Sequence, residues 1–201
     1  RPRSILIGLI GMLIAVVVGV LVSLRLSLGE ESQEKPAFTW WVINRLAFLV
    51  AASNLASFLL YFLQERFPGL QGNAAAQPAT LLVMATGIAI LLAALPAGWL
   101  ADKIGTKPVL AVSGIIAAAG TLVVIDAQDM STMTVGAVLV GVASGAFYSA
   151  NWALGTQIVP KKEAGRYLGI SNLAGAGAGA IGAYIGGPIG DSSGYVVQMA
   201  I

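Results

Sequence analysis

The sequence contains no cysteine and no histidine among its 201 residues. These absences exclude disulfide bonds, thiolate nucleophiles, imidazole bases and the usual zinc or haem ligands. The remaining residues show no nucleophile–base pair and no cluster of metal-binding side chains. We therefore expect no cofactor, no metal centre and no enzymatic activity.

Charge is also scarce. Only 10% of the residues are charged, whereas 57% are hydrophobic, and soluble domains carry about 25% charged residues. The eleven basic residues are scattered between apolar runs, so they form no patch that would bind nucleic acid. The composition predicts a protein whose solvent and main partner is the lipid bilayer.

Long apolar segments repeat along the chain, separated by short polar connections. A bilayer core of about 30 Å requires roughly 20 apolar residues in a helix, and the runs lack the two-residue alternation of membrane strands. The sequence thus predicts an all-α, polytopic transmembrane helix bundle with antiparallel neighbours. The predicted spans are 4–24, 40–63, 79–100, 108–126, 133–159 and 167–190, and a seventh starts near Tyr195.

Basic residues gather in alternate connections. Connections 25–39, 101–107 and 160–166 hold most of the Lys and Arg residues, so the positive-inside rule predicts that these three face the cytoplasm. We expect a multi-pass protein of the plasma membrane or the bacterial inner membrane. Arg45 lies a few residues inside a span, where it either snorkels to the headgroups or pairs with another helix or an anionic substrate.

The segment Gly98–Leu110 (GWLADKIGTKPVL) resembles the signature loop of the major facilitator superfamily, which joins two helices on the cytoplasmic face. Thr106 stands where that loop usually has a basic residue. The matching residues are Gly98, Leu100, Asp102, Lys103, Gly105 and Lys107.

Each matching residue also has a physical interpretation. Gly98 allows two helices to approach closely, and Gly105 can adopt the positive φ of a tight turn. Asp102 can accept N–H groups at the start of a neighbouring helix, while Lys103 and Lys107 can reach carbonyls or lipid phosphates. Two interpretations remain open and are compatible: a polar latch that favours one transporter state, and a charged turn that only fixes topology.

Two further segments extend the resemblance. Gly187, Asp191 and Gly194 repeat the spacing of Gly98, Asp102 and Gly105, which predicts inverted three-helix repeats. Chance is the alternative explanation, because glycine is abundant. The connection 160–166 is similar to another superfamily loop, in which Glu163 and Arg166 flank a helix start. Arg166, or the helix beginning at Tyr167, is then the expected partner of Asp102. The alternative is that the charges of this connection are solvated and only fix its side of the membrane.

The resemblance covers roughly residues 4–195 and implies a domain organisation. Residues 1–24 correspond to the last helix of the N-terminal half of a transporter, and residues 25–39 to its central cytoplasmic loop. Residues 40–201 correspond to the six-helix C-terminal domain with its last helix truncated. On this interpretation the chain lacks an N-terminal half with which it would pair.

Polar and aromatic side chains identify candidate cavity residues. Tyr148, Asn151 and Trp152 are spaced i, i+3 and i+4, so they share a helical face. Asn54 and Tyr61 are spaced i and i+7 on another span. Hydroxyl, amide and indole groups suit a neutral polyol, although such side chains also satisfy one another between helices. The sequence around Trp152 and Val159 resembles sugar-transporting branches of the superfamily.

Two patterns limit the choice of function. The GxGxxG spacing at Gly177–Gly182 follows no strand, so it does not predict dinucleotide binding; glycines at i and i+4 instead favour close helix packing. No Asp or Glu lies near the centre of any span. A coupling carboxylate must then lie elsewhere in the protein, unless the protein is a facilitator or does not transport.

The sequence therefore predicts a secondary transporter that moves a small solute by alternating access. It does not identify the solute, and the resemblance to sugar-transporting branches adds a sugar-like solute as one candidate. The alternative is a transporter-like subunit with a structural or assembly role in a larger membrane complex.

Overall fold

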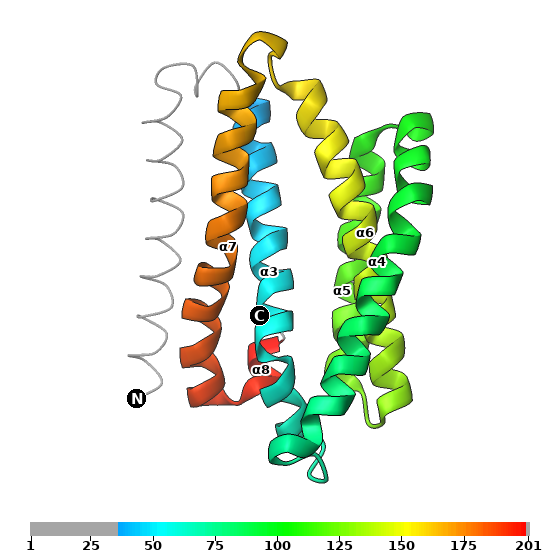
Figure 1. Ribbon diagram of the computed structural model, residues 1–201, viewed down its shortest axis with the longest axis vertical. Helices are drawn as coiled ribbons and strands as arrows, with labels where there is room; N and C mark the ends of the chain where they lie inside the picture. Colours follow the sequence, from blue (N-terminus) through cyan, green and yellow to red (C-terminus); the bar gives the residue numbers. More distant parts are fainter. Residues whose placement is uncertain (1–35, 200–201) are drawn as a thin grey trace. The chain divides into compact units, whose positions relative to one another are not determined.

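The computed structural model describes residues 36–199, which form helices and turns with no strand in that range (Figure 1). This confirms the predicted all-α fold. The predicted span 4–24 and most of the connection 25–39 lie outside the described residues. The helices are α3 Pro36–Arg66, η1 Gly72–Ala75, α4 Ala76–Ile104, α5 Thr106–Asp126, α6 Met130–Ile158, η2 Lys161–Glu163, α7 Ala164–Ser193 and α8 Tyr195–Met199.

Five helices in the described range are long and apolar enough to cross a membrane. They contain the five predicted spans 40–63, 79–100, 108–126, 133–159 and 167–190, with α6 ending one residue before the predicted end. The helices mostly extend past the apolar runs, because a helix can continue into the polar interface while it satisfies its own backbone groups. Thus α4 continues past the predicted end of its span at residue 100 and ends at Ile104.

The connections are shorter than the hydropathy pattern indicated. Gly105 alone separates α4 from α5, and Gly194 alone separates α7 from α8. Both glycines have positive φ, +92° and +87° respectively, a conformation that other residues rarely adopt. The two turns that share the G-x3-D-x2-G spacing therefore end in the same way.

The chain divides into two compact units, each described by itself. Within residues 36–199, the first unit holds 36–54 and 155–192, and the second holds 55–154 and 193–199. The division falls inside α3 and α6, so each of these helices contributes to both units.

In the first unit, the first part of α3 runs beside α7 (Figure 1). The buried rings of Phe38 and Tyr167 meet edge to face with their centroids 4.8 Å apart. Further along, a Cβ placed on Gly182 would lie 3.1 Å from the Val50 carbonyl oxygen. The glycine-rich sequence of α7 thus allows its backbone to approach α3, as the i, i+4 glycine pattern predicted.

In the second unit, α4, α5 and α6 pack side by side (Figure 1). A Cβ on Gly141 would lie 2.6 Å from the Thr86 carbonyl oxygen of α4, and a Cβ on Gly136 would lie 2.9 Å from the Val124 nitrogen of α5. Glycines on α6 therefore set its distance from both neighbours.

Apolar side chains fill the second unit at the end opposite the α4–α5 turn. Buried residues of α3, η1, α4, α5, α6 and α8 meet there, together with Ala127 after α5. The cluster is Phe58, Phe62, Leu63, Ala75, Leu82, Val124, Ala127, Met133, Ala137 and Met199.

Asp129 caps the start of α6 beside this cluster. Its carboxylate accepts the backbone N–H and the hydroxyl of Thr132, both at 2.9 Å. The backbone hydrogen bond from Thr132, followed by the hydroxyl bond, lowers the pKa of Asp129 below its usual value, because both bonds favour the charged form.

Candidate functional site

The signature turn lies where α4, α5 and α6 meet in the second unit. A Cβ on Gly98 would lie 2.8 Å from the Ser149 hydroxyl oxygen of α6, so the predicted close helix approach at Gly98 is present. Ala97, Ala101, Val109 and Ala150 form a small buried cluster there. A buried cluster of mostly small apolar side chains therefore packs the helices together next to the polar residues of the turn.

The polar residues of this turn face outward. Asp102, Lys103 and Lys107 are exposed, and the Lys103 ammonium lies over the Trp99 ring at 3.8 Å from its centroid. The sequence did not predict this cation–π contact, and the contacts expected for Lys103, with carbonyls or lipid phosphates, stay predictions. Thr106, the departure from the family pattern, is buried, so this position faces the helix packing rather than the headgroups.

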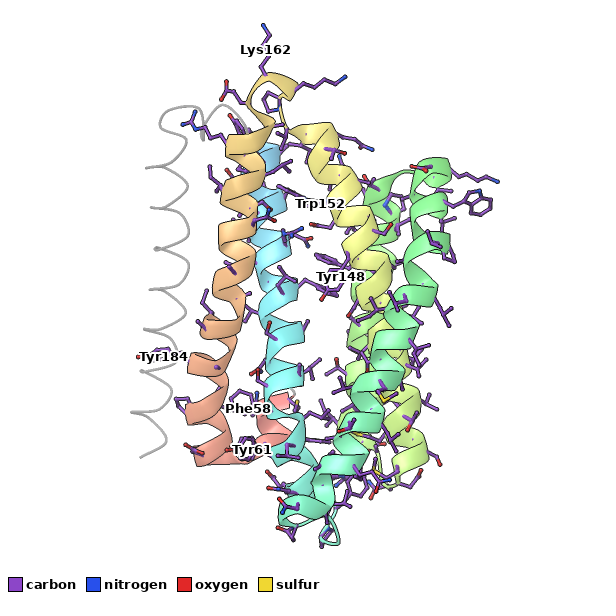
Figure 2. The ribbon with its side chains drawn as sticks, in the orientation of Figure 1. Phe58, Tyr61, Tyr148, Trp152, Lys162 and Tyr184 are labelled. Atoms are coloured by element: carbon purple, nitrogen blue, oxygen red, sulfur yellow. The ribbon has the colours of Figure 1, made fainter. Side chains whose placement is uncertain are left out.

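The connection 160–166 belongs to the first unit and carries its own ion pair. An Arg166 guanidinium nitrogen lies 3.5 Å from a Glu163 carboxylate oxygen, and both side chains are partly exposed. Lys162 extends from the tip of this turn (Figure 2). The pairing of Asp102 with Arg166 or with the start of α7 stays a prediction, because these residues lie in separate units.

The candidate residues of α6 divide between its surface and its interior. Tyr148 and Trp152 are 38% and 43% exposed and project one turn apart (Figure 2), whereas Asn151 is fully buried. The spacing predicted one shared face for all three. The predicted face therefore carries two partly exposed rings and a buried amide, and its role as a cavity wall stays a prediction.

The candidates of α3 also differ in environment. The side-chain oxygen of Asn54 is buried and has no hydrogen-bond partner among the described residues. A buried amide oxygen without a partner is costly, which makes Asn54 a candidate to bind solute or water. Tyr61 is 49% exposed, and its ring stacks on Tyr195 at 5.1 Å between centroids.

Arg45 lies against α7 in the first unit. A Cβ on Gly175 would lie 3.9 Å from the Arg45 Nε, and Arg45 is half-buried. Both interpretations of this intramembrane arginine, snorkelling to the headgroups and pairing with another helix or an anionic substrate, stay predictions.

Two residues at the end of α3 had no predicted role. The Glu65 carboxylate accepts the backbone N–H of Tyr195, and the Arg66 Nε donates to the Ala127 carbonyl at 2.9 Å. The only sequence signal is a Glu–Arg pair at a helix end, because the partners lie 130 and 61 residues away.

Comparison with known proteins agrees with this architecture. A family model for the Major Facilitator Superfamily matches residues 41–200. The minor myo-inositol transporter IolF of Bacillus subtilis (strain 168) is 33% identical over 97 residues, which are 48% of this chain and 22% of that protein. The matched part thus spans about a fifth of that relative's length.

The family match and the five membrane-length helices identify an integral, multi-pass membrane protein. This chain belongs to the Major Facilitator Superfamily.

Proposed function

We propose that the protein is a secondary transporter that moves a small neutral polyol or sugar by alternating access. Membership of the superfamily and similarity to a protein named as a myo-inositol transporter support membrane transport. On this proposal, solute binds between two six-helix halves near the middle of the bilayer. Residues 40–201 form the C-terminal half, residues 1–24 the last helix of the N-terminal half, and residues 25–39 the loop between them.

The exposed pair Tyr148 and Trp152 carries the choice of solute. Each ring is more than a third exposed on α6. An aromatic face stacks on the C–H face of a polyol, and the phenol and indole groups hydrogen-bond its hydroxyls without a charge. The unpartnered Asn54 oxygen adds an acceptor. Tyr61 and Asn151 complete the proposed set of cavity residues. Asn151 contributes as a buried residue of α6.

The signature turn and the 160–166 turn are proposed to form the conformational latch. Gly98, Asp102, Lys103, Gly105 and Lys107 supply one side. The Glu163–Arg166 pair supplies the other, and on this proposal Arg166 exchanges Glu163 for Asp102 during the transport cycle.

We place both turns, and residues 25–39, in the cytoplasm, because they hold most of the positive charge. Residues 1–201 contain no cysteine, so single cysteines introduced there can be labelled once any cysteine elsewhere in the full-length protein has been replaced. Positions 103 and 162 should react with a membrane-impermeant maleimide only from the cytoplasmic side. Labelling of the two positions from opposite sides would contradict the orientation.

Uptake of radiolabelled myo-inositol into proteoliposomes tests the function. The full-length protein should give saturable uptake, and Trp152→Ala and Tyr148→Ala should each raise KM about fivefold or more, in line with the loss of one stacking residue. Tyr184→Ala is the matched control, because this tyrosine is exposed on α7 (Figure 2) and is not one of the proposed cavity residues.

The same preparation separates transport from the alternative role. Folded protein that moves neither myo-inositol nor any other polyol or sugar would contradict the proposal. If it also co-purified stoichiometrically with a large membrane complex, the assembly role would be favoured.

A further inference from the structure

The consecutive residues Glu65 and Arg66 bind two different segments at the end of α3. Glu65 accepts the N–H of Tyr195 at the start of α8. Arg66 donates to the carbonyl of Ala127, directly after α5. All of these residues belong to the second unit. The two opposite charges therefore satisfy backbone groups of two other helix ends.

Gly194 leaves room for the Glu65 carboxylate because it has no side chain. A Cβ at this position would lie 2.7 Å from Glu65 Oε1, and the φ of Gly194 is +87°. Any other residue would both strain the backbone and displace the carboxylate. We refer to Glu65, Gly194 and the Tyr195 N–H as the carboxylate clasp.

The side chain of the clasped residue joins an aromatic stack. The Tyr195 ring lies 5.1 Å from the Tyr61 ring at an interplanar angle of 19°, and 5.8 Å from the Phe58 ring at 27°. Phe58 and Tyr61 project from α3 next to α8 (Figure 2). Glu65 lies one helical turn beyond Tyr61, so α3 holds Tyr195 by its backbone and by its ring.

We propose that Glu65 is a positioning residue for solute binding: by fixing Tyr195 it holds the Tyr61 ring in one orientation. This inference rests on the proposed function, since Tyr61 is one of the proposed cavity residues. A ring that is already ordered binds solute without the entropic cost of being immobilised. Loss of the clasp should therefore weaken solute binding while it leaves the transport cycle largely intact.

Hydrogen exchange of the Tyr195 amide tests the clasp without reference to transport. In the full-length protein, Glu65→Ala should make this amide exchange at least about tenfold faster, because it removes the acceptor. Glu65→Gln keeps an acceptor oxygen and should remain near the wild-type rate. Gln77→Ala, an exposed side chain at the start of α4, is the control. Unchanged exchange in Glu65→Ala would overturn the clasp.

Transport kinetics test the positioning role. Glu65→Ala should raise the KM for myo-inositol about three- to tenfold, the range expected for losing the order of one side chain, with Vmax within about twofold. Glu65→Gln should restore most of the affinity. In a Tyr61→Ala background, Glu65→Ala should change KM no further, because the ring that it positions is absent. An equal effect of Glu65→Ala with and without Tyr61 would overturn the positioning role.

The outcomes separate this inference from the proposed function. If the wild-type protein transports no polyol or sugar, the proposed function fails, and with it the positioning role; the exchange measurement still decides the clasp. If Glu65→Ala does not fold, Glu65→Asp replaces it. The Asp side chain is one methylene shorter, so its carboxylate should hold the Tyr195 N–H less well. Glu65→Asp should therefore exchange this amide faster and raise KM, both by less than expected for Glu65→Ala. Wild-type exchange and KM in Glu65→Asp would overturn the inference.

Discussion

The α4–α5 turn and the α7–α8 turn have the same residue spacing and differ in their surroundings. Each ends in a single positive-φ glycine, Gly105 or Gly194. Among the described residues, a Cβ on Gly105 would meet only Pro108 Cδ at 3.8 Å, whereas one on Gly194 would meet the Glu65 carboxylate at 2.7 Å. Local backbone geometry alone requires glycine at the first turn, and a long-range contact adds a second requirement at the other.

The first glycines of the two turns differ in the opposite sense. A Cβ on Gly98 would lie 2.8 Å from the Ser149 hydroxyl oxygen, while a Cβ on Gly187 would have no atom of the described residues within 4 Å. The first turn is therefore tight at its beginning and open at its end, and the second turn is open at its beginning and tight at its end. A repeated sequence pattern has thus acquired two different packing roles.

The largest expected effect comes from the positive-φ glycines. Gly105→Ala and Gly194→Ala should each destabilise the protein by about 1–3 kcal/mol from backbone strain. Gly194→Ala should cost about 1 kcal/mol more, because Glu65 must release the Tyr195 N–H. Thermal unfolding in detergent measures both changes.

A double-mutant cycle isolates the contact. In a Glu65→Ala background the extra cost of Gly194→Ala should disappear, whereas that of Gly105→Ala should stay the same. Equal costs of Gly194→Ala in both backgrounds would show that the carboxylate does not distinguish the two turns.

A smaller effect is expected at the first glycines. Gly98→Ala should cost about 1 kcal/mol from overpacking against Ser149, and Ser149→Ala should recover most of that loss. Gly187→Ala should leave stability unchanged or raise it by up to about 1 kcal/mol, since alanine favours a helix over glycine. The same unfolding measurement checks both variants, and a Gly187→Ala variant less stable than Gly98→Ala would reverse the comparison.

The smallest effect concerns the α5–α6 turn, which closes with a side-chain cap instead of a glycine. Hydrogen bonds from Thr132 lower the pKa of Asp129 below its ordinary value of 3.8. A carboxyl group with a lowered folded-state pKa contributes stability above its unfolded pKa and loses it as the pH falls through the folded value. Wild type should therefore exceed Asp129→Asn in melting temperature at pH 7, and the difference should vanish in acid below pH 3.8. A difference that persists unchanged in acid would exclude the carboxylate as its source.

The membrane-length helices were predictable from the sequence because the signal is local. Each span is a continuous apolar run, and a backbone in lipid must satisfy its own hydrogen bonds. The turn at Gly105 was predictable for the same reason, since glycine readily adopts a positive φ. At Gly194 the sequence predicted only the repeated spacing, and the structure shows the matching φ. Helix ends were predicted less accurately, as at Ile104 of α4, because hydropathy marks the lipid core and not the last hydrogen bond.

The candidate site was predictable only in outline. Helical spacing placed Tyr148 and Trp152 on one face, but the same spacing did not reveal that Asn151 is buried. An i+3 neighbour lies at the edge of a face, and the adjacent helices decide whether that edge is covered. The cation–π contact of Lys103 with Trp99 was not predicted, although the two residues are only four apart. An exposed lysine side chain can reach several partners, and the sequence does not indicate which one it contacts.

The sequence by itself determined the solvent of this protein, its helices and the positions of its sharp turns, because hydropathy and backbone conformation depend on residues close together in the chain. The tertiary structure decided which glycines are crowded, which polar residues are buried, and that Glu65 holds Tyr195. Those contacts join atoms up to 130 residues apart, and only the packing of helices brings such atoms within hydrogen-bonding distance.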